Sequence, residues 1–300
     1  MSRAEAAADA AAGTATPPRP VRLSWTLGLF RSEAVIVFRR WRTLALFAVL
    51  AAVPILIGIA VKIESSGGGS VDGGRGGGPA FITQVTNNGL FLVFTSLAVT
   101  LPIFLPMAIG VVAGDSIAGE ASSGTLRYLL VAPAGRTRLL LAKYVSVLAF
   151  CLAATLVVAA CALLVGAILF PLGDVTLLSG TTVPFSEGLL RALLIAVAVA
   201  ASLVGIAALG LFVSTLTNSG IAAMATTIGL LITVQIVDTI PQLQAVQPYL
   251  FTHYWLSFAD ILRDPVYWDD LRSNLILQAV YAVVFGSAAW ARFTTRDITV

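Results

Sequence analysis

Charged residues are scarce in this sequence. Only 11% of its 300 residues are Asp, Glu, Lys or Arg, whereas 58% are apolar, and the mean hydropathy is +0.94. A soluble domain usually carries about 25% charged residues. The chain therefore has too little polar surface to cover a globule in water, and we expect the lipid bilayer to surround most of it.

Cysteine, histidine and lysine are also rare. Cys151 and Cys161 lie in one apolar run, on different faces of a helix, so they predict buried small residues rather than a disulfide framework. The single histidine, His253, cannot build a zinc site alone. Neither Lys62 nor Lys143 follows a glycine, as a Walker A loop requires. We therefore predict no metal site, no catalytic residues and no nucleotide hydrolysis by the chain itself.

Long apolar runs are what the sequence has in abundance. A transmembrane helix needs about 20 mainly apolar residues, and six runs have roughly that length: 43–63, 90–113, 144–170, 189–213, 220–240 and 275–291. They predict an all-α polytopic membrane protein with six transmembrane helices. Their centres contain no charged residue, which argues against a proton-coupled carrier or a voltage sensor.

The basic residues between the runs indicate an orientation. Of the 18 Lys and Arg residues, 13 lie before the first run, between the second and third, or after the sixth. The other five are Lys62, Arg75, Arg191, Arg263 and Arg272. By the positive-inside rule, both termini are cytoplasmic and the protein is a multi-pass protein of the cell (inner) membrane. Because the basic excess lies beside the spans, it does not indicate nucleic-acid binding.

The ends of the chain differ from the central region, 43–291. Residues 1–20 are Ala-rich and polar and lack the apolar core of a signal peptide, so we expect a disordered cytoplasmic tail. Residues 292–300 form a cytoplasmic C-terminus. Residues 21–42 predict an amphipathic helix along the inner leaflet, with apolar residues at helical spacing: Leu23, Leu27, Phe30, Ala34, Val37, Phe38 and Trp41. The alternative is that the first span simply begins early, but Arg39, Arg40 and Arg42 argue against burial.

The two longer external loops differ in composition. The stretch 65–79 is rich in glycine and predicts a flexible connector. The stretch 241–274 is rich in aromatic residues, with Phe251, Trp255, Phe258 and Leu262 in one helical stripe. Further rings suit the membrane interface: Tyr249, Tyr254, Tyr267 and Trp268. We expect a short helix or a re-entrant pair at the outer surface there.

The longest internal cytoplasmic connection is 114–143, and Asp115 is expected to begin it. Ser122 or Ser123 can cap a short helix that ends before Pro133. That helix would carry Leu126, Leu129 and Leu130 on one side, and the return into the membrane is marked by Arg136, Arg138 and Lys143. The residues alone allow an ordinary capped helix at the membrane face.

The order of residues in this connection resembles a known family. Glu120, Gly124-Thr125-Leu126, Leu129-Leu130, Pro133, Arg136 and Lys143 are similar to the segment between spans two and three of ABC-2-type transporter permeases. The resemblance implies that 122–131 is a coupling helix docked in a groove of a partner ATPase. The implied interface comprises Glu120, Ser122, Ser123, Gly124, Thr125, Leu126, Arg127, Leu129, Leu130 and Pro133. The connection 214–219 matches the family in position only.

The same resemblance implies an assembly and a direction of transport. Two permease protomers, identical or different, would bind two ATPase subunits that hold ATP and Mg, while this chain carries no cofactor. We expect export rather than import. Spans two and five would lie near the path, for which the candidates are Thr95, Ser96, Thr100, Pro102 and Pro106. The two prolines predict a kink in span two, whereas the hydroxyl groups can equally bond back to their own helix.

Two other functions remain open on the sequence. The first is a membrane anchor or mechanical transducer for an ATPase that transports nothing itself. The second is an integral-membrane enzyme acting on lipid, which needs clustered acids, histidines or an activated nucleophile. The nearest acidic cluster lies in the aromatic loop and comprises Asp260, Asp264, Asp269 and Asp270.

Overall fold

The computed structural model describes residues 23–66, 82–124 and 135–295. Among these residues, six helical segments are long and apolar enough to cross a membrane. They are α3 (Trp41–Ser66), α6 (Phe104–Ser122) preceded by the shorter α5 (Phe91–Thr100), α8 (Arg136–Leu169), the pair α9 (Phe185–Ser202) and α10 (Val204–Leu216), α11 (Gly220–Thr239) and α12 (Asp269–Thr295). The prediction of an all-α polytopic membrane protein is confirmed.

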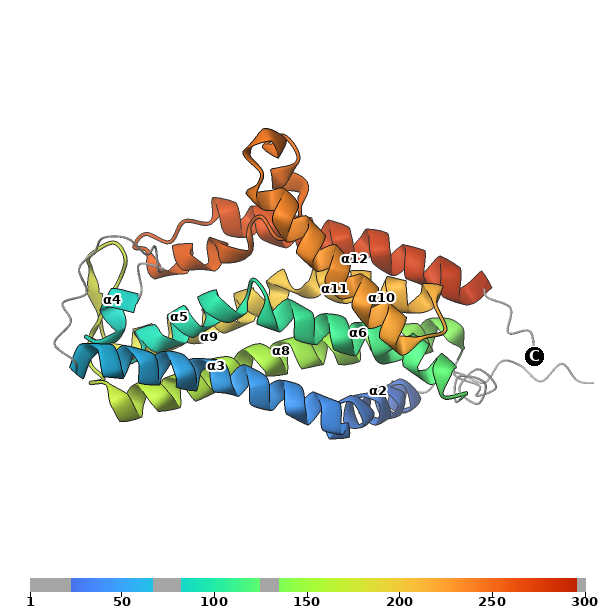
Figure 1. Ribbon diagram of the computed structural model, residues 1–300, viewed down its shortest axis with the longest axis horizontal. Coiled ribbons are helices and arrows are strands. Elements are labelled where there is room, and N and C mark those ends of the chain that lie inside the picture. The colour runs from blue at the N-terminus through green and yellow to red at the C-terminus, as the bar shows by residue number, and fades with distance from the viewer. Residues whose placement is uncertain (1–22, 67–81, 125–134, 296–300) are drawn as a thin grey trace, which may run out of the picture.

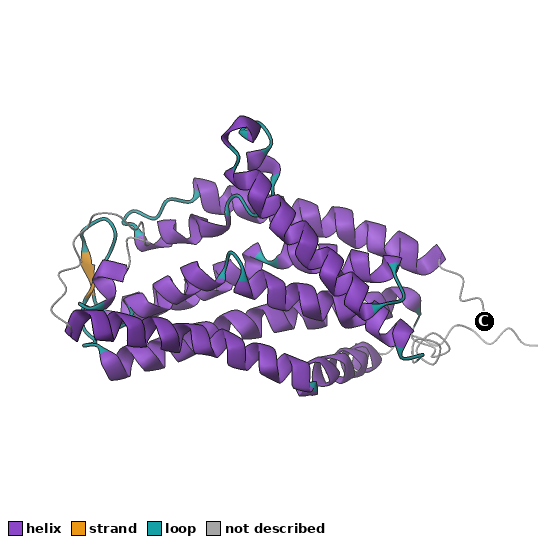
Figure 2. Cartoon of the chain, in the orientation of Figure 1, coloured by secondary structure: helices purple, strands orange, loops and turns teal. Residues whose placement is uncertain are grey.

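The remaining elements do not form spans. They are α2 (Leu23–Arg39), α4 (Ile82–Val85), the 3₁₀ helices η1 (Pro241–Leu243), η2 (Gln247–Tyr249) and η3 (Trp255–Leu262), and the antiparallel pair β1 (Val175–Thr176) and β2 (Thr182–Val183). Figure 2 shows how little strand the fold contains. The apolar pattern of the sequence did not predict this small hairpin.

Most of the spans run along the long axis of the bundle (Figure 1). One end holds α2, the end of α6, the start of α8 and the end of α12, and the opposite end holds α4 and the β hairpin. Helices α2 and α12, the first and last described, therefore lie at the same end of the bundle, as an even number of membrane crossings requires. We call this end the α2 end; that it faces the cytoplasm remains a prediction.

The outer faces of several helices are apolar and exposed. Leu56, Ile168, Ile221 and Val283 are each at least 66% exposed. Large apolar side chains exposed on several helices are what a surrounding lipid bilayer would cover.

The predicted amphipathic helix is a separate element. Helix α2 ends at Arg39 and α3 begins at Trp41, so the first span does not simply begin early. Helix α2 packs along α8, with Val37 and Phe38 against the core. The placement of Trp41 on the apolar face of this helix was wrong, because Trp41 starts α3 and is 82% exposed.

Span two is broken where its prolines predicted a kink. Helix α5 ends at Thr100, α6 begins at Phe104, and Pro102 lies in the turn between them. Proline lacks the N–H that would continue the helix, and its ring clashes with the preceding turn. The side-chain amide of Gln235 on α11 donates to the Pro102 carbonyl.

Span four is also broken, at Leu203 between α9 and α10, and no proline is present there. Polar side chains of α12 bind the groups at this break. Gln278 Oε1 accepts from the Gly205 N–H at 3.2 Å, and Asn274 Nδ2 donates to Ser202 Oγ at 2.6 Å. Gln278 Nε2 also donates to the Phe251 carbonyl at 2.8 Å. Buried side chains thus satisfy irregular backbone within the bundle, as an apolar environment requires.

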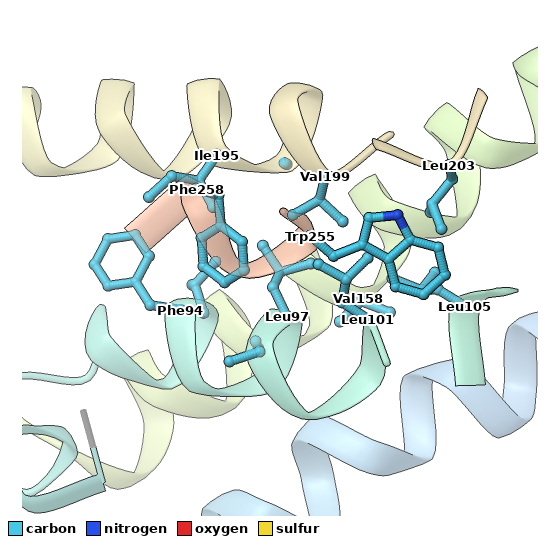
Figure 3. Packing of buried hydrophobic residues seen from close by; sticks show 14 of the residues in the cluster. Phe94, Leu97, Leu101, Leu105, Val158, Ile195, Val199, Leu203, Trp255 and Phe258 are labelled. Atoms are coloured by element: carbon cyan, nitrogen blue, oxygen red, sulfur yellow. The ribbon is translucent and has the colours of Figure 1, made fainter. Parts of the chain in front are cut away.

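The aromatic stripe of the last loop lies in the core. Helix η3 packs against α9, and Figure 3 shows Trp255 and Phe258 between α5 and α9. Phe251 and Leu262 are buried as well. The expectation of short helices in this loop is therefore confirmed, and the stripe faces the core of the bundle. Apolar rings suit a protein core as well as a membrane interface, and here the gap between α5 and α9 takes them.

Candidate functional site

The structure changes the boundaries of the connection 114–143. Helix α6 continues to Ser122 and α8 begins at Arg136, so most of this connection is helical and continuous with spans two and three. Asp115 does not begin a loop as predicted; it lies about two turns inside the end of α6. The apolar pattern alone hid this extension, because Asp115 and Glu120 interrupt it.

Both serines predicted to open the next helix instead close α6. Ser122 is the last residue of α6, and its hydroxyl donates to the Gly119 carbonyl at 2.8 Å. The Ser123 hydroxyl donates to the Glu120 carbonyl at 3.2 Å, and Gly124 follows at φ +71°, the left-handed conformation that often ends a helix. The predicted coupling residues Thr125, Leu126, Arg127, Leu129, Leu130 and Pro133 lie outside the described residues.

A buried group of three charges joins the helices that flank residues 125–134. Lys143 on α8 donates from Nζ to Glu120 on α6 at 2.6 Å and to Glu33 on α2 at 3.1 Å. The three residues are 3%, 7% and 4% exposed, respectively. We call them the lysine cluster. Removal of one partner from such a pair leaves an uncompensated buried charge, so the cluster holds α2, α6 and α8 together.

A second ion pair lies beside the first. Arg40 and Arg42, at the bend between α2 and α3, approach Asp115 Oδ2 with their Nη1 atoms at 2.9 and 3.4 Å. Arg40 and Arg42 are partly or largely exposed, whereas the Asp115 side chain is 13% exposed. The two groups together contain three acids and three bases, so their formal charges cancel. This pairing lowers the free-energy cost of burying the charges between the helices.

Two glycines, one on α6 and one on α11, leave space for the Asp115 carboxylate between these helices. A Cβ atom at Gly119 or at Gly220 would overlap the Asp115 carboxylate, so a larger residue at either position would displace it. Gly220 is the first residue of α11. A carboxylate there interacts favourably with the N-terminal end of the helix dipole. Asp115 therefore connects the bend at Arg40 with the start of span five.

Ser214 links span four to the same part of α6. Its hydroxyl donates to the Gly114 carbonyl at 2.6 Å and accepts from the Ile117 and Ala118 N–H groups at 3.0 and 2.9 Å. From the sequence, Ser214 was expected in a loop, but it lies in α10 and is completely buried. A side chain inserted in this way into the ladder of another helix fixes the relative position of the two helices.

The two charged groups line one small cavity. Its volume of about 30 Å³ is enough for a single water molecule. Besides the six charged residues, it is lined by Thr43, Ser116 and Ser146 and by apolar side chains of α2, α3, α6 and α8. The arrangement is therefore a polar joint between helices, with no space for a larger ligand.

The other predicted residues lie elsewhere. Thr95 and Thr100 bond back to the Phe91 and Ser96 carbonyls, as the alternative for these hydroxyls predicted, and with Ser96 they are fully buried. Asp260 pairs with Arg263 at 3.0 Å, and Asp269 and Asp270 lie in the first turn of α12.

His253 and the cysteines were given no site by the sequence. His253 contacts Asp238 through Nδ1 and Oδ1 at 2.8 Å, a pairing the sequence did not indicate. Cys151 is buried and Cys161 half-buried, and both are free thiols. Within residues 23–66, 82–124 and 135–295, no three His, Cys, Asp or Glu side chains come together as a metal site.

The fold is that of an all-α polytopic membrane protein. The two ion-paired groups, which we call the charged joint, lie at the α2 end of its bundle. Residues 72–299 match the family model DUF2705, described as a protein of unknown function, and the chain belongs to that family. No curated protein gave a significant match.

Proposed function

We propose that this chain is the membrane permease subunit of an ATP-binding cassette exporter of the ABC-2 type. A separate ATPase subunit would supply the energy by binding at the α2 end. The resemblance of residues 120–143 to the coupling segment of such permeases motivates the proposal. The observation that carries it is the buried contact between Lys143 and Glu120, because these residues belong to the two helices that flank residues 125–134.

A partner ATPase can change the conformation of the membrane helices only if the segment that it binds is mechanically connected to them. A docked segment 125–134 would pull on α6 and α8 as a unit, since the lysine cluster joins them. The displacement would reach α10 through Ser214 and α11 through Asp115. The joint therefore provides a continuous physical route from the proposed docking segment to spans two to five.

The distribution of charges also favours an external source of energy. The two ion-paired groups lie within about two turns of the helix ends that face residues 125–134. The carboxylates of Glu33, Glu120 and Asp115 are paired with Lys or Arg close to these helix ends. A proton-coupled carrier instead needs ionisable groups spaced along its path through the membrane.

A non-transporting anchor for the ATPase would use the same joint, so the experiment must separate the two functions. The chain is co-expressed with a candidate ABC ATPase subunit, the complex is reconstituted into liposomes, and ATP hydrolysis is measured with and without candidate lipophilic substrates. An exporter predicts substrate-stimulated hydrolysis and ATP-dependent movement of substrate. Hydrolysis by the complex with neither property would favour the anchor.

A further inference from the structure

An apolar cavity of about 480 Å³ lies between the last two spans, and none of the charged residues of the two ion-paired groups lines it. Helix α10 forms its floor, and α11 and α12 form its walls. Helix α11 packs on α6 and α10, and α12 packs on α10, but α11 and α12 share little contact with each other. Figure 1 shows α11 running obliquely across the bundle. The two walls therefore diverge and leave a wedge between them.

The lining of this wedge is suited to a hydrocarbon chain. No charged side chain lines it, and its surface is formed mainly by aliphatic and aromatic residues such as Leu209, Phe212, Leu230 and Phe285. Phe251 and Tyr281 line the end near the middle of the bundle, where the Tyr281 hydroxyl donates to the Tyr249 carbonyl at 2.9 Å. Leu216 and Thr217 lie at the other end, where α10 gives way to α11.

The volume of the cavity can be compared with that of two possible occupants, a lipid acyl chain and a helix from a second copy of the chain. Apolar ligand sites commonly have volumes of about 300–1,000 Å³, so the cavity has the size for one long acyl chain. A helix about 10–12 Å across occupies roughly 400–600 Å³ for each turn. A span from a second copy of the chain could therefore place only about one turn in the cavity. The size favours a lipid chain over a second copy.

A basic side chain lies on α12 nearer the α2 end than the residues of that helix that line the wedge. Arg292 follows the lining residue Phe285 by seven positions on α12, which places it on the same face about two turns nearer the α2 end. It is exposed, and it makes no salt bridge with another described residue. A lipid whose chain fills the wedge would bring its phosphate to the level of this guanidinium, which is suited to bind a phosphate group.

We propose that the wedge between α11 and α12 is a binding site for an anionic phospholipid, with one acyl chain in the cavity and the phosphate at Arg292. The site involves neither residues 125–134 nor the lysine cluster, so it does not depend on the proposed function.

Thr226 and Thr233 provide matched positions for a test. Both are exposed on α11, but only Thr226 lines the cavity.

The test uses photo-activatable phosphatidylglycerol and phosphatidylcholine, each carrying a diazirine on one acyl chain, in vesicles containing the full chain. Labelled peptides are mapped by mass spectrometry. We expect phosphatidylglycerol to label 209–217, 222–234 and 281–285 preferentially. Thr226→Trp should abolish the preferential labelling, whereas Thr233→Trp should leave it unchanged. Loss of one surface charge should cut the preference for the anionic lipid about five-fold in Arg292→Gln.

Three outcomes would overturn the proposal. The first is equal labelling of the exposed faces of α3, α11 and α12, which describes ordinary surrounding lipid. The second is an unchanged lipid preference in Arg292→Gln, a surface variant that does not disturb the core. The third is efficient disulfide crosslinking between two copies of Thr226→Cys, since a second chain would then occupy the wedge.

Discussion

Lys143 on α8 and Glu120 on α6 meet within the bundle with 2.6 Å between Nζ and Oε1, although residues 125–134 separate them along the chain. Both side chains are buried. The contact fixes how far apart the two ends of that segment can lie. In the proposed permease it makes α6 and α8 respond together when a partner binds the segment.

The first prediction concerns the lysine cluster. Lys143→Met should lower the stability of the folded chain by about 3–5 kcal/mol, because it leaves the carboxylates of Glu33 and Glu120 buried without a cation. Thermal unfolding in detergent measures the effect. Lys62→Met is the matched control, since Lys62 is exposed at the opposite end of the bundle. The triple variant with Glu33→Gln and Glu120→Gln should recover part of the loss, and equal melting of Lys143→Met and Lys62→Met would contradict the cluster.

The second prediction concerns Ser214. Ser214→Ala should destabilise the chain by about 1–3 kcal/mol, because the Ile117 and Ala118 N–H groups lose a buried acceptor. Ser287→Ala is the control, since that exposed hydroxyl bonds only to its own helix at Val284. Thermal unfolding and amide hydrogen exchange around residue 117 report the change. Unaltered exchange there in Ser214→Ala would show that the contact does not hold α6.

The third prediction concerns the space around Asp115. Gly220→Ala should displace the carboxylate and weaken its pairs with Arg40 and Arg42, at a cost of about 1–3 kcal/mol for the added group. Gly229→Ala is the control, because nothing lies within 4 Å of a Cβ at that position of α11. It should be neutral or slightly stabilising, since alanine favours a helix more than glycine does. Melting temperatures that rank the two variants in the opposite order would refute the packing argument.

The fourth prediction concerns orientation. Residues 127, 21 and 297 should be accessible from the cytoplasm, and residues 72 and 264 from outside. Single cysteines at these positions, in a background with Cys151 and Cys161 replaced, are labelled with an impermeant reagent in intact and permeabilised cells. Labelling of position 127 in intact cells would reverse the assignment of the α2 end.

The sequence predicted the number and approximate positions of the spans because apolar runs of about 20 residues are typical of transmembrane helices. It could not indicate which spans are neighbours, since helices that are apolar on most sides carry little information about their contacts. Glu33, Glu120 and Lys143 illustrate the limit. Glu120 and Lys143 were singled out in the connection 114–143 and Glu33 was not, but the meeting of the three depends on how α2, α6 and α8 pack.

Two further residues illustrate the same limit. Ser214 was assigned to a connection because the fourth apolar run was read as ending at residue 213, yet it lies in α10, where its hydroxyl is satisfied by the backbone of α6. Trp255 was recognised as part of an apolar helical stripe, but the sequence could not indicate that it fills the core between α5 and α9. In both cases a neighbouring helix, far away in the sequence, decides the environment.

The last prediction concerns the segment 125–134. If its leucines dock in a groove of the ATPase, Leu126→Asp and Leu129→Asp would each bury an unpaired carboxylate at the contact, which costs several kcal/mol. Arg127→Ala should have a milder effect, because a charge at the rim contributes modestly to binding. The variant chains should still insert into the membrane. Normal thermal unfolding of each variant confirms that any loss of binding arises at the contact.

Co-purification of the chain with its ATPase, followed by measurement of ATP hydrolysis, tests the proposed permease function most directly. We predict no hydrolysis by the chain alone, hydrolysis by the wild-type complex, and loss of the ATPase from the Leu126→Asp and Leu129→Asp variants. Hydrolysis by the isolated chain, free of contaminants by mass spectrometry, would contradict the proposed function, as would full retention of the ATPase by both variants.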